Sequence, residues 1–281
     1  MFAASLATAG AAWLSGRAYA RNPPNHPMSI TSQADLAGLQ RISEAVGTTL
    51  QQMRDYAQPG MTTKDLDDYG GQLLAALGAR SAPRLTYGFP GWTCISVNNE
   101  VAHGIPSAGK VLQEGDLVNI DVSAELGGYW ADNGGSFVLG TDIRNHQPLV
   151  DASRRILRTA LSRIHGGVRI ADIGGLIEAE ARKAGFRVIK NLVGHGIGRS
   201  LHEEPTEIPC YYDRYNRKRF QKDSVVAIET FISTRATLAH QLGDGWTLAT
   251  KDGSFVAQHE HTIVITDDQP LILTAANRIW E

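Results

Sequence analysis

The first pattern in the chain is a helix that begins after Ser32. Ser32-x-x-Asp35 resembles a capping box, in which two side chains satisfy the free N–H groups of a helix start. Apolar residues then recur at helical spacing until Pro59-Gly60 ends the helix, because proline cannot donate to the helical ladder. A second cap, Thr62-x-x-Asp65, predicts another helix that closes at Gly78.

The same plan recurs later in the chain. One apolar stripe runs at helical spacing from Leu149 to Ile164, and another helix is predicted from Ile170 to Gly185. Each helix pair is followed by extended segments and a His-Gly step, at His103-Gly104 and at His195-Gly196. This order indicates an internal duplication. Because the candidate site motifs occupy both halves, we expect residues 32–281 to form one composite domain.

Residues of high β propensity predict five longer strands. Gly127-Gly128 lies between two of them and is a typical two-residue hairpin. That turn pairs Ser123 with Asp132, which places Asp121 on the same sheet face and diagonal to Asp132. The strands are predicted over residues Thr93–Val97, Leu117–Leu126, Tyr129–Leu139, Ser224–Ser233 and Gln258–Thr266.

The N-terminal segment has a different character. Residues 2–15 are apolar and Ala18-Tyr19-Ala20 resembles a cleavage site, but no positive charge precedes the run, and it is too short to span a bilayer. Residues 21–27 read as a flexible spacer, and Met28 is a second possible start. We therefore expect residues 1–31 to be a disordered extension, with an export or targeting leader as the alternative.

Composition narrows the classes of function. The 281 residues are 42% hydrophobic and carry a net charge of −2, so nothing indicates binding to nucleic acid or to an anionic membrane. The two cysteines, Cys94 and Cys210, provide neither a disulfide framework nor a four-thiolate zinc site. A reducing compartment suits them, so we expect a cytoplasmic protein unless residues 1–20 act as a leader.

Five scattered residues indicate the chemistry. Carboxylates within or beside apolar β-type runs cost several kcal/mol (about 3–5) unless they are paired or bind metal. Four acidic residues and one histidine of this kind are the ingredients of a site for two divalent ions. They are Asp121, Asp132, His195, Glu229 and Glu260. In the last strand Gln258, Glu260 and Thr262 share one face. His259 and His261 on the other face are interpreted as packing residues, or as residues that support the ligands, rather than as ligands.

Four ordered blocks resemble type I methionine aminopeptidases. They are residues 98–106 (NNEVAHGIP), 115–122 (GDLVNIDV), 194–205 (GHGIGRSLHEEP) and 244–266 (DGWTLATKDGSFVAQHEHTIVIT). The resemblance covers about residues 32–275. It implies an α/β (α+β) pita-bread fold, in which two pseudo-symmetric halves form one curved antiparallel sheet with helices on its outer side.

The resemblance also implies roles for single residues. Asp121, Asp132, His195, Glu229 and Glu260 would bind two divalent metal ions, with Asp132 and Glu260 bridging them. The ions would be Co, Mn, Fe or Zn, and would activate a water for hydrolysis. By the same resemblance His202 would stabilise the oxyanion that develops on the scissile carbonyl, His103 would contact the next amide, and Glu229 would also relay a proton from the bridging water.

The sequence departs from the family near the pocket. Thr230 follows Glu229 where proline is usual, and Asn133 follows Asp132 where a small hydroxyl residue is common. Thr86–Pro90 replaces a Tyr-His-Gly-Tyr-Pro stretch, and Leu201 stands at a position that is commonly aromatic. Phe89 and Trp246 are the expected walls for a methionine side chain, with Tyr87 as an alternative, while ordinary packing explains each aromatic equally well.

The resulting hypothesis is a methionyl aminopeptidase that removes the initiator methionine from nascent polypeptides at the ribosome. We expect it to act as a monomer. The nearest alternative is an Xaa-Pro aminopeptidase of the same fold, although such enzymes commonly carry a large extra N-terminal domain. A non-catalytic peptide-binding protein of this fold is the third hypothesis, and it would typically have lost metal ligands.

Overall fold

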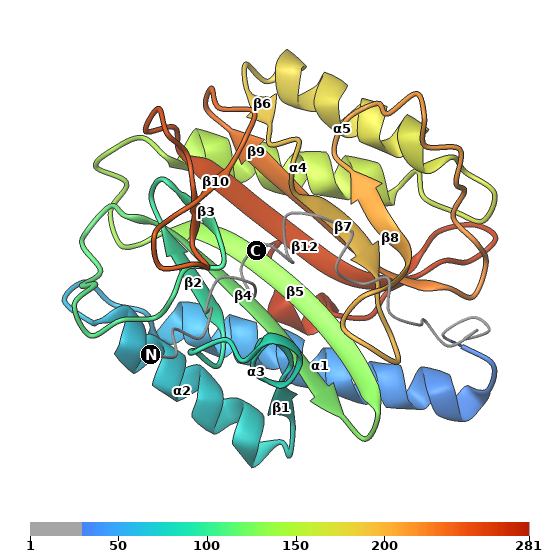
Figure 1. Cartoon of the computed structure of the whole chain (residues 1–281), viewed down its shortest axis with the longest axis horizontal. Helices are drawn as coiled ribbons and strands as arrows, with labels where there is room; N and C mark the ends of the chain where they lie inside the picture. Colours follow the sequence, from blue (N-terminus) through green and yellow to red (C-terminus); the bar gives the residue numbers. More distant parts are fainter. Residues whose placement is uncertain (1–29, 281) are drawn as a thin grey trace, which may run out of the picture.

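The structure is a computed structural model that describes residues 30–280 (Figure 1). The extension predicted over residues 1–31, the choice between Met1 and Met28, and the leader hypothesis therefore fall almost entirely outside the described residues. None of the helices within residues 30–280 has the length and apolar character needed to cross a membrane.

The two helices of the N-terminal half begin at the predicted caps. Helix α1 spans Gln33–Tyr56, and the side chain of Ser32 accepts a hydrogen bond from the Asp35 N–H at its start. Helix α2 spans Thr63–Ala76 and opens with a complete capping box between Thr62 and Asp65. A third helix, α3 (Ala82–Tyr87), is not predicted by the apolar spacing because it is only six residues long.

The C-terminal half repeats this arrangement with α4 (Gln147–Leu161) and α5 (Ile170–Lys183). Both follow the predicted apolar stripes. The same order, a helix pair followed by two long antiparallel strands, thus occurs twice in the described chain. A short 3-10 helix, η2 (Ala275–Asn277), precedes the C-terminal residues.

The strands form one large and one small sheet. In the large sheet the main order is β1-β4-β5-β12-β9-β7-β8, with β2 beside β4, β6 beside β9 and β13 beside β12. Strands β10, β11 and β3 form the small sheet. The bounds are β1 Arg80–Ser81, β2 Cys94–Val97, β3 Glu100–Ala102, β4 Leu117–Leu126, β5 Tyr129–Val138, β6 Arg187–Val188, β7 Val193–Gly196, β8 Glu203–Pro209, β9 Val225–Ser233, β10 His240–Gln241, β11 Leu248–Ala249, β12 Val256–Val264 and β13 Leu271–Ile272.

All five predicted strands are confirmed, with ends that shift by no more than two residues. Gly127 and Gly128 both have positive φ, at 61° and 83°, as a tight hairpin between β4 and β5 requires. The predicted register is also confirmed, because Ser123 pairs with Asp132. The shorter strands were not predicted, since two to four residues carry too little alternation to be recognised.

Helices α1 and α4 lie behind the large sheet in Figure 1, and α1 contacts β4 and β5 while α4 contacts β9 and β12. The main hydrophobic core fills the space between these helices and the sheet. It includes Leu50 and Met53 of α1, Ile156 of α4, Ile120 of β4 and Ile228 of β9, each no more than 2% exposed. Burial of this apolar layer fixes one face of the sheet and leaves the other face for polar side chains.

A seam runs between the two halves, where β5 adjoins β12. Only His259 and Gly135 form a register pair across this seam among the described residues. Side chains provide further hydrogen bonds. Thr262 Oγ1 accepts from the Asp132 N–H at 3.0 Å, and Ser136 Oγ accepts from the Gln258 N–H at 2.9 Å. Since β5 belongs to the first half and β12 to the second, these side chains join the halves.

Candidate metal centre

Five neighbouring strands each provide one of the predicted ligand residues. In the order of the sheet they are β4, β5, β12, β9 and β7. The residues in the same order are Asp121, Asp132, Glu260, Glu229 and His195. Asp132 and Glu260, which are 128 residues apart in the chain, thus lie on adjacent strands.

The strand register places these side chains on one face. Glu260 pairs directly with Glu229, and His195 pairs with Ala227, which lies two residues before Glu229 on the same face. In the first half, the pairing of Asp132 with Ser123 puts Asp121 on that face as well. The opposite face of these strands packs against α1 and α4.

Three of the five residues lie close enough together for their side chains to bind one metal ion. One potential ligand atom from each of Asp132, His195 and Glu260 falls within 4.8 Å of the others. Nε2 of His195 is 3.9 Å from Oδ2 of Asp132. The other carboxylate oxygen of Asp132, Oδ1, is buried without a hydrogen-bond partner among the described residues. A buried carboxylate oxygen of this kind is costly unless a cation or a proton satisfies it.

The carboxyl groups perturb one another. Burial is the main cause that raises the pKa of Asp132 to about 6. Burial and the charges of neighbouring carboxylates raise the pKa values of Asp121, Glu229 and Glu260 well above their usual range. A divalent cation would reverse this effect, because it favours the ionised form of every carboxylate around it. The donor set of four carboxylates and one imidazole fits such ions.

His195 is held in the form that a metal ligand requires. Its Nδ1 lies 2.9 Å from the carbonyl oxygen of Gly196 and donates to it, so the lone pair of Nε2 is directed toward the carboxylates. Burial lowers the pKa of His195 to about 4, and the imidazole is neutral at pH 7. The flanking glycine is needed because a Cβ at Gly196 would lie 2.3 Å from the carbonyl oxygen of Glu204.

A chain of amides orients Glu260. Nε2 of Gln258 donates to Oε2 of Glu260 at 3.0 Å, and Nδ2 of Asn119 donates to Oε1 of Gln258 at 2.7 Å. Neither amide was predicted to have a role in the site. Asn119 lies two residues before Asp121 and therefore on the same face, which is the signal that would have identified it.

Of the two further histidines of the prediction, His103 is buried and His202 is half-buried. His202 Nδ1 lies 2.9 Å from the hydroxyl of Tyr87, and the His202 ring is 4.1 Å from that of His195 between centroids. Burial lowers the pKa of His202 well below its usual value and that of His103 to about 4. His103 also has a positive φ of 54°, directly after β3.

The predicted pocket walls contact each other. The rings of Phe89 and Trp246 meet edge to face, with centroids 5.2 Å apart. Leu201 packs in a separate hydrophobic cluster beside Tyr87.

Cys94 was not assigned a role, but it pairs with Asp121 across β2 and β4 and so shares the face of the ligand residues. His259 and His261 lie on the other face as predicted. His259 forms a hydrogen bond with Ser153, and His261 forms one with Thr274.

A sheet that gathers four carboxyl groups and one imidazole on one face, with helices covering the other, defines a metalloenzyme of the pita-bread architecture. Residues 37–267 match the model of metallopeptidase family M24. The chain belongs to this family.

Relatives with high sequence or structural similarity to the chain include methionine aminopeptidases. Methionine aminopeptidase 2 of Bacillus subtilis is 51% identical over 247 residues, which cover 88% of this chain and 99% of that protein. The crystal structure of a methionine aminopeptidase from Thermotoga maritima has a TM-score of 0.84 at 34% identity and covers 88% of this chain and 99% of its own. These matches confirm the resemblance and the fold that the motifs predict.

An X-Pro aminopeptidase structure from Thermotoga maritima is similar in fold, with a TM-score of 0.70 at 19% identity. The match covers 88% of this chain but only 62% of that structure. The alternative hypothesis therefore shares the architecture, and the site must distinguish the two.

Proposed function

We propose that this protein is a metal-dependent methionine aminopeptidase that hydrolyses the bond after an N-terminal methionine. The observation that carries the proposal is that five adjacent strands each provide one candidate ligand, and that ligand atoms of three of them, Asp132, His195 and Glu260, lie within 4.8 Å of one another. The 51% identity to the Bacillus subtilis relative supports methionine as the first residue. The X-Pro aminopeptidase structure from Thermotoga maritima is 19% identical to this chain, which argues for the fold alone.

The residues that would hold two ions of Co, Mn, Fe or Zn are Asp121, Asp132, His195, Glu229 and Glu260, and Asp132 and Glu260 would be shared between the ions. Asp132 and Glu260 lie on the two seam strands, β5 and β12, so they stand at the centre of the ligand row. Their ligand atoms, together with one from His195, already fall within 4.8 Å. When bound, such ions lower the pKa of a coordinated water and polarise a carbonyl group.

The remaining residues of the site would bind and orient the peptide. His202 is neutral, so its Nε2 can donate a hydrogen bond to the scissile carbonyl when Tyr87 donates to Nδ1. We assign contact with the following amide to His103 and proton relay to Glu229. Phe89 and Trp246 would form the wall of the methionine pocket, and their edge-to-face contact supports a rigid wall.

The natural substrates in this proposal are the N-termini of nascent polypeptides that emerge from ribosomes. We expect the protein to act as a monomer in the cytoplasm, unless the N-terminal residues direct export. The proposal involves neither nucleic acid recognition nor a membrane.

The test is peptide cleavage by metal-free protein reconstituted separately with Mn, Co, Fe or Zn. The peptides are Met-Ala-Ser, Leu-Ala-Ser and Ala-Pro-Ala, which differ in the feature that each hypothesis recognises. Metal-dependent release of methionine alone supports the proposal. Preferential cleavage of Ala-Pro-Ala would move the protein to the Xaa-Pro class, and tight metal binding without cleavage would favour the non-catalytic hypothesis.

A further inference from the structure

The loop that carries His202 belongs to the second half of the chain but lies against the first half. It comprises residues 197–202, between β7 and β8, and Figure 1 shows it reaching toward the hairpin of β4 and β5. The N–H of Trp130, the second residue of β5, donates to the carbonyl oxygen of Gly198 at 2.9 Å. Because Asp132 follows two residues later on β5, the loop is attached to a strand that provides a candidate metal ligand.

The side chain of Arg199 contacts the first half from this loop. Its guanidinium forms an ion pair with Asp35, in the first turn of α1. The guanidinium carbon also lies 3.9 Å from the centre of the ring of Tyr129, the first residue of β5. The Tyr129 hydroxyl donates to the same carboxylate oxygen of Asp35, Oδ1, at 3.1 Å. These three residues, referred to as the clamp, therefore join the loop, α1 and β5.

The two partners of Arg199 are held in place by other contacts. Asp35 is 5% exposed, and its second oxygen, Oδ2, accepts hydrogen bonds from Thr31 and Ser32. The ring of Tyr129 packs closely on α1, where a Cβ at Gly38 would lie 2.2 Å from it. The guanidinium thus meets a fixed carboxylate at its edge and a fixed ring at its face. Such a contact orients the arginine, whereas an isolated ion pair between two flexible surface side chains does not.

The backbone of the loop connects Arg199 to His202. The N–H groups of Arg199 and Ser200 both donate to Oε1 of Glu203, at 2.6 and 2.8 Å, and hold the loop in a tight turn. The Ser200 hydroxyl donates to the carbonyl oxygen of His202 at 2.8 Å, and Leu201 between them is 2% exposed. A displacement of Arg199 would therefore be transmitted to His202.

We propose that Arg199 is a positioning residue that fixes His202 relative to the candidate metal centre. It does so by holding the loop against Asp35 and Tyr129. This inference rests on the proposed function, in which His202 donates to the scissile carbonyl. A donor stabilises a developing oxyanion only when it lies about 2.7–3.1 Å from the position of that oxygen in the transition state. A displacement of about 1 Å can lower the rate by about 100-fold.

The test compares Arg199→Met with Arg80→Met by steady-state cleavage of Met-Ala-Ser, using the metal-loaded full chain. Methionine keeps an apolar stem similar to that of arginine but lacks the guanidinium. Arg80 is the matched control, because its Nε pairs at 2.7 Å with Glu125, whose other oxygen accepts from the N–H of Gly128 in the same hairpin. The control variant thus removes an ion pair beside the hairpin and leaves the clamp intact.

We expect Arg199→Met to lower kcat about tenfold, with KM and bound metal unchanged, because the loop is disturbed and the ligand residues are not. Arg80→Met should retain the wild-type kcat. In a His202→Ala background, Arg199→Met should lower kcat no further, since it acts through His202. Arg199→Lys keeps the charge without the planar donor group, so it should lower kcat as well, and it replaces Arg199→Met if that variant fails to fold.

Amide hydrogen exchange measures the clamp independently of activity. The N–H groups of residue 199, Ser200 and Trp130 form hydrogen bonds within or to the loop, so their exchange should become about fivefold faster in Arg199→Met and stay unchanged in Arg80→Met. A wild-type kcat in Arg199→Met, or an equal loss in the His202→Ala background, would overturn the proposal, and so would unchanged exchange. Failure of the wild-type protein to cleave Met-Ala-Ser would instead refute the proposed function, while the exchange measurement would still decide whether Arg199 holds the loop.

Discussion

The hydrogen bond between Tyr87 and His202 permits a sharp test of the proposed reaction. In the proposed role, Nε2 of His202 donates to the oxygen of the scissile carbonyl, and this requires the proton on Nε2 rather than on Nδ1. The Tyr87 hydroxyl lies 2.9 Å from Nδ1 and stabilises that form by donating to it. The phenylalanine variant Tyr87→Phe removes the hydroxyl and keeps the ring.

The expected effect follows from the strength of one hydrogen bond. A partly buried hydrogen bond contributes about 1–1.4 kcal/mol net, which corresponds to a decrease of about five- to tenfold in kcat. The decrease belongs to kcat rather than KM, because His202 interacts more strongly with the charge of the transition state than with the neutral carbonyl of the substrate.

The assay is steady-state cleavage of Met-Ala-Ser by the metal-loaded wild-type protein and the variant. Tyr212→Phe is a suitable control, since Tyr212 is 50% exposed and loses a hydroxyl of no catalytic consequence. In a His202→Ala background, Tyr87→Phe should have no further effect on kcat, because the two residues act through one interaction. An unchanged kcat, or an equal loss in the His202→Ala background, would refute the assigned role of Tyr87.

Three further predictions concern the metal centre and the fold. Asp132→Asn should reduce peptide cleavage to background and lower the metal content measured after dialysis, because a shared carboxylate loses its charge; wild-type turnover would contradict the ligand assignment. Gly104→Ala should lower the free energy of unfolding by about 1–3 kcal/mol in urea, since the new Cβ would lie 2.2 Å from the Ile95 carbonyl oxygen, whereas Gly109→Ala should have little effect. Finally, metal-loaded protein should lose more stability than metal-free protein when the pH falls from 7 to 5. Buried histidines with lowered pKa values take up protons only on unfolding below about pH 6.5, so their contribution to stability is lost on acidification, while in metal-free protein the raised pKa values of the ligand carboxyls oppose this loss. An equal decrease in the urea midpoint of both forms between pH 7 and pH 5 would contradict this prediction. Such histidines include His103, whose pKa is lowered to about 4, and His259 and His261, whose pKa values are lowered to about 3.

Local chemistry in the sequence predicts local structure well. The caps at Ser32 and Thr62 determine where α1 and α2 begin, because each side chain accepts a hydrogen bond from an N–H group of the first turn. Gly127-Gly128 fixes the register of β4 and β5, and through it the common face of Asp121 and Asp132. These features depend on residues close together in the chain, so their pattern can be read without the fold.

The pairing of strands that lie far apart in the chain cannot be predicted from the sequence pattern. Nothing in the alternation of β5 or β12 indicates that they adjoin, because strand order depends on how the two halves pack. The hydrogen bond from Tyr87 to His202 spans 115 residues, and that from Asn119 to Gln258 spans 139. The motifs still indicated candidate ligands, because Asp121, His195 and Glu260 each lie in a long, ordered block, whereas single aromatic residues near Pro90 have no such context.

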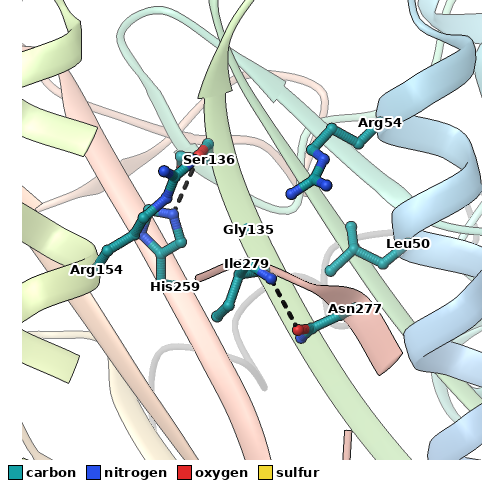
Figure 2. A pocket seen from close by; sticks show the side chains of 8 residues that line it. All are labelled: Leu50, Arg54, Gly135, Ser136, Arg154, His259, Asn277 and Ile279. Carbon is teal, nitrogen blue, oxygen red and sulfur yellow. Dashed lines mark hydrogen bonds between the residues drawn. The ribbon is translucent and has the colours of Figure 1, made fainter. Parts of the chain in front are cut away.

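The seam between β5 and β12 explains why the candidate metal centre lies where it does. Asp132 on β5 and Glu260 on β12 project to the face that carries the other candidate ligands, while Gly135 and His259 on the same two strands lie on the opposite face (Figure 2). Since the first strand belongs to one half and the second to the other, metal ions held by Asp132 and Glu260 would join the two halves. Metal binding should therefore stabilise the contact between the halves, in addition to removing the repulsion among the carboxylates.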